Sequence, residues 1–357
     1  MQLGFIGLKY SGKSTLFELL TQGKFESVHS GMAEYHRGQV MVPDERIDRL
    51  SAMFRPKKTT YAYFDCIDVM GIPASLRTDQ AAKYMEAVRQ TDSLVAVIQV
   101  FDGYDAEGKA ARIDPVADLK RLEEDIIFAD LIVADNRLEK VRHLKVRSAP
   151  QFNPKELDIL EKCKAVLEEN RPLRNVEIHD HEDKLIRGFQ FLSKKPLMAV
   201  LNCDEAHYAE RAGYENAFRE AFPGIPVTSV SALGEKEIQE LEEEERLLFM
   251  QELGIEEPAI HHVIATSYAA FGLISFFTVG EDEVRAWTLR AGAPAPEAAG
   301  TIHSDLQKGF IRAEVIAYDD FIREGSMAAA KAKGLVRLEG KEYPVKDGDI
   351  LNIRFNV

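Results

Sequence analysis

The sequence predicts an α/β fold in which a doubly wound sheet is interrupted by a helical hairpin and followed by a smaller α+β domain. A strand–loop–helix pattern opens the chain, and apolar runs without polar alternation follow at residues 94–100, 197–201 and 226–230. Such runs are typical of parallel strands buried on both faces. A long amphipathic stretch separates the first run from the second. We therefore expect a ligand at the carboxyl ends of the strands.

The first element is a phosphate-binding loop. The pattern G-x-x-x-x-G-K-[ST] is complete from Gly7 to Ser14, after the apolar residues 3–6 and before a helical face at residues 16–20. Loop N–H groups and the helix N-terminus bind phosphate oxygens, while the lysine reaches the outer phosphates and the hydroxyl binds Mg²⁺. We take Lys13 as the catalytic candidate and Ser14 as a metal ligand. The expected phosphate contacts are Lys9, Tyr10, Ser11, Gly12, Lys13, Ser14 and Thr15.

The next elements lead to a carboxylate. Residues 39–42 read as a strand, residues 43–53 as a short helix, and residues 61–68 as a second strand. That strand ends in the pattern D-x-x-G, from Asp68 to Gly71. Downstream of a phosphate loop, this pattern predicts that Asp68 holds Mg²⁺ through water and that the Gly71 N–H approaches the terminal phosphate.

The insertion at residues 111–189 reads as a helical hairpin. Apolar residues recur at three- and four-residue steps from 116 to 144, and Asn153 then precedes Pro154 as an N-cap, with Glu156 placed for a capping-box-like arrangement. The far end of the first helix is basic. Its cations either complement a helix C-terminus or contact phosphates of a nucleic acid. They are Arg137, Lys140, Arg142, Lys145 and Arg147.

Composition limits the class of protein. The 357 residues carry a net charge of −14, so a uniformly basic nucleic-acid-binding protein is excluded. The three cysteines are far apart and predict neither a disulfide framework nor a zinc site. No stretch approaches the roughly 20 apolar residues of a membrane span, and no signal peptide is evident. We expect a cytoplasmic protein without a membrane partner.

The C-terminal portion changes character near residue 272. Short strand-like runs at residues 274–278, 284–287, 310–316 and 350–357 surround alanine-rich helical segments, which predicts a separate α+β domain. Its basic residues do not outnumber its acidic ones. Composition therefore gives no independent argument for RNA binding by this domain.

Motifs along nearly the whole chain resemble the YchF subfamily of Obg-like P-loop NTPases. The stretches that carry the resemblance are the phosphate loop and residues 42–46, 68–71, 114–118, 276–280, 283–287, 298–303, 308–314, 318–321 and 347–349. The resemblance implies a P-loop NTPase domain at residues 1–110 and 190–271, a helical coiled-coil insertion at 111–189, and a β-grasp-like TGS domain at 272–357. Family members hydrolyse ATP and often GTP, and they associate with ribosomes.

The resemblance also indicates which nucleotide base the site prefers. Guanine-specific relatives carry Asn-Lys-x-Asp after a buried strand, and that Asp accepts two hydrogen bonds from guanine. Residues 202–205 read Asn-Cys-Asp-Glu, similar to the N-x-x-E of the YchF group. Because the Glu205 side chain is longer than that of Asp, its carboxylate is misplaced for accepting both hydrogen bonds from guanine. Losing these two bonds can erase strong discrimination between guanine and adenine. We expect ATP, with GTP as a second candidate. The residues expected to frame the base are Asn202, Cys203, Glu205, Ser231 and Ala232.

Several positions depart from the family pattern or from other GTPases. Lys9 and Tyr10 stand in the phosphate loop where the family usually has a small or proline-type residue at position 9. Met32 lies near the position of a Mg²⁺-binding switch threonine, and the apolar Ile72 stands where many GTPases orient water with Gln. Residues 106–112 lack the histidine that the family is thought to use in hydrolysis. Because phosphoryl transfer depends on positioning, we expect nucleotide binding to be retained and hydrolysis to be slow.

Three functions remain open from the sequence. The first is a weak Mg²⁺-dependent ATPase whose nucleotide state biases the hairpin and the TGS domain toward a ribosome or RNA partner. The second is a non-catalytic module that senses nucleotide and docks a partner. The third is an ordinary GTP switch.

Overall fold

The computed structural model describes residues 2–30, 33–69, 85–104, 108–110, 112–242, 244–246, 248 and 257–356. The chain forms two compact units. The first unit comprises Met1–Gln39 and Asp65–Val263, and the second comprises Val40–Phe64 and Ile264–Val357. The sequence places residues 40–64 in the NTPase domain, whereas the structure groups them with the C-terminal segment.

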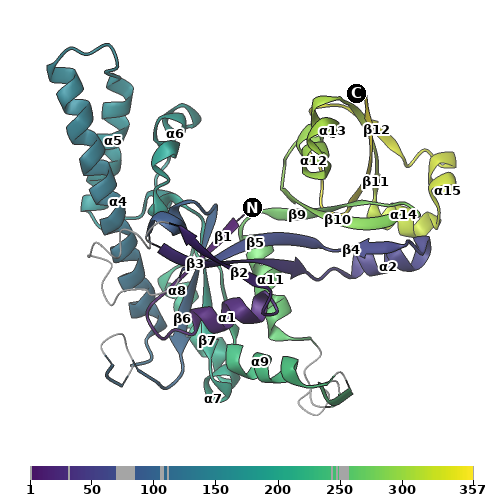
Figure 1. Ribbon diagram of the computed structural model, residues 1–357, viewed down its shortest axis with the longest axis horizontal. Helices are drawn as coiled ribbons and strands as arrows, with labels where there is room; N and C mark the ends of the chain where they lie inside the picture. Colours follow the sequence, from purple (N-terminus) through teal and green to yellow (C-terminus); the bar gives the residue numbers. More distant parts are fainter. Residues whose placement is uncertain are drawn as a thin grey trace. The chain divides into compact units, whose positions relative to one another are not determined.

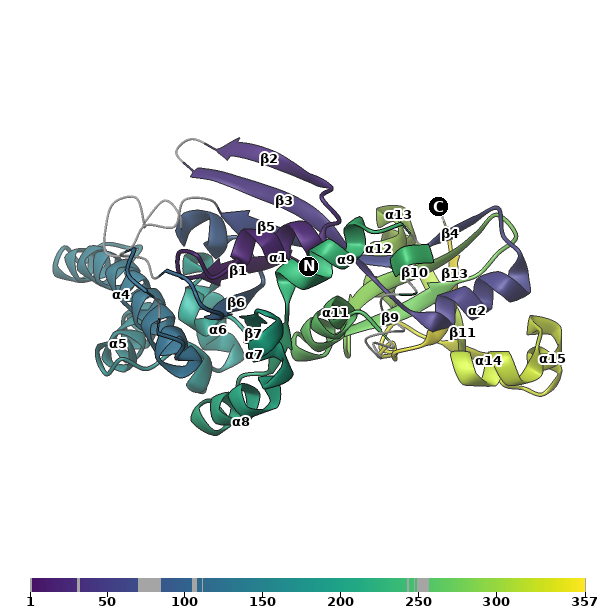
Figure 2. The ribbon, with the colours of Figure 1, turned by 90° about the horizontal axis from the view of Figure 1, so that it is seen from below.

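The first sheet has seven strands in the order β2-β3-β5-β1-β6-β7-β8. β1 pairs in parallel with β5 and β6, β6 with β7, and β7 with β8, while β2 and β3 form an antiparallel pair at one edge (Figure 2). The doubly wound sheet expected from the apolar runs is confirmed. The strands are β1 (Gln2–Gly7), β2 (Phe25–Ser30), β3 (Ala33–Val42), β5 (Ala62–Val69), β6 (Ser93–Val100), β7 (Leu197–Cys203) and β8 (Val227–Val230).

Helices pack against this sheet through a core that joins β6 and β7 to Leu119, Leu122 and Ile126 of α4 and to Phe218 of α8. No helix in the described part of the chain is both long enough and apolar enough to span a bilayer. The helices of this unit are α1 (Lys13–Leu20), α4 (Pro115–Val146), α5 (Pro154–Glu168), α6 (Asp180–Ile186), α7 (Glu205–Ala209), α8 (Arg211–Ala221) and α9 (Ala232–Glu240), with 3₁₀ turns η1 (Leu173–Asn175), η2 (Arg187–Phe189) and η3 (Leu192–Lys194). The boundary between the two units falls within α11 (Ala259–Ala270).

The expected helical hairpin is confirmed, since α4 and α5 lie side by side (Figure 1) over a buried core that includes Leu138 and Leu160. Asn153 is the N-cap of α5, and its side chain accepts a hydrogen bond from the Lys155 N–H. The expected capping-box role of Glu156 is wrong. Its carboxylate instead accepts a 2.7 Å hydrogen bond from Arg137 of α4, because this cation lies within reach across the hairpin.

A buried ion pair fixes the middle of α4. Asp130 is fully buried and accepts a 2.6 Å hydrogen bond from Arg89, together with bonds from the N–H groups of Leu192 and Ser193. Arg89 also donates to the carbonyls of Ala129 and Gln190. Because each group of this pair has partners, the buried charges are compensated.

The second unit contains a six-stranded sheet in the order β12-β11-β13-β9-β10-β4. β9 and β13 are parallel neighbours, and α12 packs against one face, so the expected β-grasp-like α+β domain is confirmed. The edge strand β4 comes from residues 40–64 and pairs in parallel with β10. The elements are α2 (Glu45–Phe54), β4 (Lys58–Thr60), β9 (Leu273–Thr278), β10 (Glu283–Arg290), α12 (Ala295–Ile302), α13 (Ser304–Lys308), β11 (Phe310–Ala317), α14 (Tyr318–Glu324), α15 (Met327–Ala332), β12 (Arg337–Glu339) and β13 (Asp349–Phe355).

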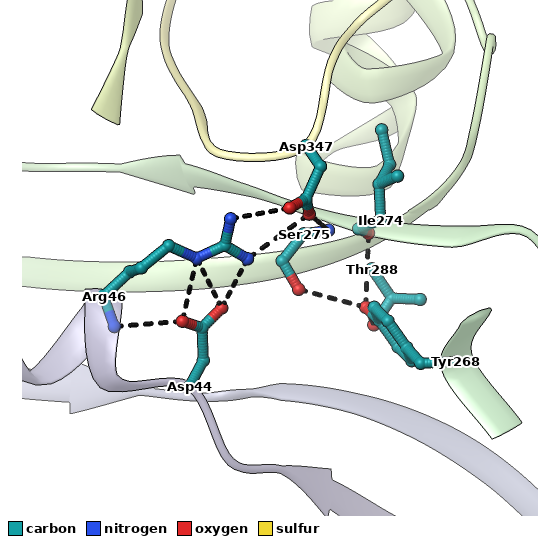
Figure 3. A network of polar contacts seen from close by, with 7 residues as sticks. All are labelled: Asp44, Arg46, Tyr268, Ile274, Ser275, Thr288 and Asp347. Carbon is teal, nitrogen blue, oxygen red and sulfur yellow. Dashed lines mark hydrogen bonds and ion pairs between the residues drawn. The ribbon is translucent and has the colours of Figure 1, made fainter. Parts of the chain in front are cut away.

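A polar network joins the two chain segments of this unit (Figure 3). Asp44 is the N-cap of α2 and also binds the guanidinium of Arg46. The same guanidinium binds Asp347, whose carboxylate accepts a 2.9 Å hydrogen bond from the Ser275 N–H. Tyr268 completes the network by contacting the Ser275 hydroxyl at 3.2 Å. Residues 40–64 are therefore held by specific bonds as well as by strand pairing.

Candidate functional site

The candidate site lies at the carboxyl ends of β1, β5, β6, β7 and β8, the edge where parallel sheets bind ligands. The loop between β1 and α1 is the phosphate-binding loop of the sequence. Gly12 is the N-cap of α1 and has φ of 80°, which favours glycine. A Cβ on Gly12 would lie 2.1 Å from Asn202 Nδ2, and one on Gly7 would lie 2.7 Å from both the Ser11 hydroxyl and the Val97 carbonyl. Both positions thus require glycine.

Three residues of the motifs meet beside the loop. Lys13 is buried, donates a 2.9 Å hydrogen bond to the Val69 carbonyl and forms an ion pair with Asp68. Burial lowers the pKa of Lys13 to about 7. The Ser14 hydroxyl donates to the other carboxylate oxygen of Asp68 at 2.7 Å. The lysine, hydroxyl and carboxylate that the sequence predicts to act together are therefore in contact.

These residues fit Mg²⁺ and a phosphate chain. A serine hydroxyl beside a fully buried carboxylate offers the oxygen ligands that Mg²⁺ prefers, with one carboxylate near enough to act through water. The buried Ser11 hydroxyl has no hydrogen-bond partner among the described residues. A phosphate bound in the loop would supply an acceptor in this neighbourhood.

Asn202 joins the loop to the far side of the site. It is buried at the end of β7, and its Nδ2 donates a 3.0 Å hydrogen bond to the Ser11 carbonyl. Its Oδ1 accepts a 3.1 Å bond from the N–H of Ala232, the first residue of α9. One amide therefore fixes the phosphate loop relative to the 231–232 turn.

The remaining base-binding candidates differ in exposure. Cys203 is packed in the core, and burial raises the pKa of its thiol to about 12. Asp204 is the N-cap of α7 and accepts a hydrogen bond from the His207 N–H. Glu205 begins that helix and is exposed. Ser231 precedes α9 and makes no side-chain capping bond. Contact of Asn202, Cys203, Glu205, Ser231 and Ala232 with a base stays a prediction.

Two further residues at this edge were missed by the sequence analysis. A Cβ on Gly12 would lie 3.9 Å from the ring of Phe101, and the buried Gln99 donates a 3.2 Å hydrogen bond to the Phe101 carbonyl. A single glutamine in the apolar run 94–100 was the available signal. Gly71, Met32 and Ile72 lie outside the described residues, as do residues 106, 107 and 111.

The basic tip of the hairpin is divided by ion pairs. Arg137 binds Glu156, and Arg142 binds Glu161 at 3.0 Å. Lys140, Lys145 and Arg147 are exposed and have no acidic partner among the described residues. Two of the five cations therefore stabilise the hairpin, and three are available to a phosphate-bearing partner.

Comparison with known proteins identifies similar chains. Residues 273–356 match the family YchF-GTPase_C, described as "Protein of unknown function (DUF933)". A Bacillus subtilis (strain 168) protein named ribosome-binding ATPase YchF is 40% identical over 362 residues, which cover 99% of both chains. An Escherichia coli O157:H7 protein of the same name is 37% identical over 360 residues, again covering 99% of both. Obg-like ATPase 1 of Bos taurus is 33% identical over 369 residues, covering 100% of this chain and 92% of the relative.

Solved structures show the same architecture. The structure titled as the Schizosaccharomyces pombe YchF GTPase superposes with a TM-score of 0.81 at 27% identity, covering 99% of this chain and 97% of that chain. A GTP binding protein from Pyrococcus horikoshii OT3 superposes with a TM-score of 0.60 at 17% identity, covering 100% of both chains. The second match concerns the fold alone.

Proposed function

Because this chain belongs to the YchF family, as its sequence motifs suggested, we propose that it binds MgATP at the phosphate loop and hydrolyses it slowly. It acts in the cytoplasm as a nucleotide-dependent protein that associates with ribosomes. The name ribosome-binding ATPase, carried by relatives that match over 99% of this chain, supports both parts of the proposal.

The observation that carries the proposal is the contact of Lys13, Ser14 and Asp68 at the carboxyl ends of the strands. Lys13 and the loop N–H groups would bind the phosphates, and the D-x-x-G pattern assigns the terminal phosphate to the N–H of Gly71. Ser14 would hold Mg²⁺, with Asp68 acting on it through water. Bound Mg²⁺ neutralises charge on the phosphate oxygens. Asn202, Cys203, Glu205, Ser231 and Ala232 frame the base.

Slow hydrolysis follows from residue types. Transition-state positioning in this class needs groups that hold the attacking water and complete the metal site. Met32 cannot bind Mg²⁺ as a threonine does, Ile72 cannot orient water, and residues 106–112 contain no histidine. The groups that bind phosphate are retained, so nucleotide binding tests this site more directly than the hydrolysis rate does.

The ribosome contact uses the hairpin tip. Lys140, Lys145 and Arg147 are the exposed cations there, and phosphate contacts of this kind give salt-dependent affinity. The TGS domain, residues 272–357, supplies the second contact. The proposed NTPase domain comprises residues 1–110 and 190–271, apart from residues 40–64, which the structure groups with the C-terminal segment, and the hairpin comprises residues 111–189.

Titration calorimetry of the purified protein with ATP and with GTP, each with Mg²⁺, tests the proposal. We expect tighter binding of ATP, loss of binding in Lys13→Ala, and a weaker dependence of affinity on Mg²⁺ in Asp68→Asn. Single-turnover hydrolysis on the same sample then measures the rate. Absence of binding by a folded wild-type protein would refute the nucleotide site and leave a docking protein.

A GTP switch is the second candidate, since the Schizosaccharomyces pombe structure is titled a GTPase. Tighter binding of GTP than ATP in direct competition would establish it. It would also show that the Asn202–Glu205 segment does not exclude guanine.

A further inference from the structure

Lys9 places an exposed cation in the phosphate loop. Its side chain is exposed, and none of the described residues gives it an acidic partner. Its ammonium lies 4.7 Å from the centroid of the Tyr10 ring, within the range of a cation–π contact. The charge is thus held against the loop by an aromatic ring and left free for an anion.

Tyr10 itself adopts an unfavourable backbone conformation. Its φ is 71°, and the residue is 52% exposed. A left-handed conformation costs a non-glycine residue about 1–2 kcal/mol, and such strain persists where surroundings impose it, often at ligand-binding sites. Here the Ser11 N–H donates to the Leu8 carbonyl at 3.2 Å, and Asn202 holds the Ser11 carbonyl. The turn is therefore fixed on both sides of the strained residue.

We infer that the Lys9 ammonium binds the terminal phosphate of a nucleoside triphosphate and that Tyr10 holds it in place over the loop. The inference rests on the proposed function. Lys13 is engaged within the site by Asp68 and Val69, so Lys9 is the second cation of the loop and the freer one. A triphosphate carries more outer charge than a diphosphate. Lys9 therefore sets the preference of the site for the triphosphate state.

The test measures binding rather than turnover. Affinities for the non-hydrolysable triphosphate analogue AMP-PNP and for ADP, each with Mg²⁺, are determined by titration calorimetry for the wild type and for Lys9→Met. We expect Lys9→Met to weaken AMP-PNP binding about tenfold, because it removes a charge-assisted hydrogen bond to the terminal phosphate. ADP lacks that phosphate, so its binding should weaken by less than about twofold. Lys9→Arg keeps the charge and should retain most of the preference.

Matched variants separate this role from general charge and from the fold. Lys24→Met removes the same charge from an exposed lysine beyond the far end of α1, and it should leave both affinities unchanged. Tyr10→Phe keeps the ring and should match the wild type. Tyr10→Gly removes the ring but suits the positive φ, so the protein should fold at least as well while the preference for AMP-PNP falls.

The outcomes are distinct. Equal affinities in Lys9→Met and wild type, or an equal loss for AMP-PNP and ADP, would overturn the role of Lys9 while leaving the proposed nucleotide site intact. A folded wild type that binds neither ligand would overturn the proposed function and the role of Lys9 with it.

Discussion

Arg46 and Asp347, which are 301 residues apart in the chain, form a forked ion pair within the second unit. Nη1 of Arg46 lies 2.7 Å from Oδ2 of Asp347, and Nη2 lies 3.3 Å from Oδ1 (Figure 3). Burial acts to lower the pKa of Arg46, but the hydrogen bonds and charges of Asp44 and Asp347 together outweigh it and raise that pKa. The arginine therefore holds two carboxylates from distant parts of the chain.

Replacing Arg46 should loosen the second unit. Arg46→Ala removes the contacts to both carboxylates, and because the pair is only partly buried we expect a loss of about 1–2 kcal/mol in unfolding free energy. Arg46→Lys should recover little, since an ammonium cannot make the forked contact. Thermal unfolding and hydrogen exchange of the Ser275 amide, which donates to Asp347, measure the effect. The control is Arg49→Ala, whose exposed 3.8 Å pair with Glu45 should contribute almost nothing. An equal effect of both variants would contradict the prediction.

Asn202→Ala should weaken both stability and nucleotide binding. The variant leaves the buried Ser11 carbonyl and the Ala232 N–H without their partner, which we expect to cost about 2 kcal/mol in denaturant unfolding. Affinity for MgATP should fall because the phosphate loop is no longer tied to α9. Asn216→Ala, at an exposed position of α8, should change neither quantity. Unchanged affinity in Asn202→Ala would show that the loop holds its shape without this amide.

Asp130→Ala should be strongly destabilising. It leaves the guanidinium of Arg89, which is only 13% exposed, without its charge partner, and breaking a buried pair typically costs about 3–5 kcal/mol. Chemical denaturation measures the loss. The control is Asp135→Ala, which lies on α4 like Asp130 but forms an exposed ion pair with Lys164 of α5. It should cost less than about 1 kcal/mol. A double variant, Asp130→Leu with Arg89→Met, should recover part of the loss, because no buried charge is then left alone.

Because of Asp118, the free energy of unfolding should fall as the pH rises from about 4 to about 6. Burial, and then the neighbouring Asp114, raise the pKa of Asp118 to about 6 in the folded chain. Since the unfolded value is about 3.9, the folded state binds more protons in this window, so the free energy of unfolding decreases as pH rises through it. Asp118→Asn removes this penalty.

Asp118→Asn should therefore stabilise the protein by about 1 kcal/mol at pH 7.5, a value reduced for the partial solvent access of the side chain. At pH 4 the variant and wild type should have similar melting temperatures. Asp158→Asn, at an exposed position of α5, serves as the control for the loss of one negative charge and is compared with the wild type at the same two pH values. Equal stabilisation at both pH values would argue against a raised pKa.

Local patterns predicted the elements of the first unit well. The run 94–100 became the fully buried β6, and Asn153 caps α5 as expected, because both depend on short-range signals. Glu156 was misjudged because its partner Arg137 lies on another helix, and no local pattern reports an ion pair across a hairpin. Asp130 went unnoticed for the same reason, since a single carboxylate on a helix face ordinarily faces water.

The sequence predicted the main residues of the candidate site but not the hydrogen bonds and backbone conformation that hold them in place. The motif identifies Lys13, Ser14 and Asp68, because phosphate chemistry requires those residue types at that spacing. It does not reveal that Asn202 is bonded at both ends or that Tyr10 has a positive φ, since both depend on how the loop is held by β7 and α9. The grouping of residues 40–64 with the C-terminal segment was likewise invisible, because β4 pairs with a strand more than 200 residues away.

The route of the chain through the second unit limits how that unit can be separated. A fragment cut at residue 264 would lose the ring of Phe54, which stacks on Phe321 at 5.6 Å between centroids, and it would uncover the edge of β10 that β4 protects. Asp347 would lose its arginine. The C-terminal segment therefore cannot be moved on its own into another protein without losing these contacts. Transplanting it into another protein would require residues 40–64 to travel with it, or a redesigned edge in their place.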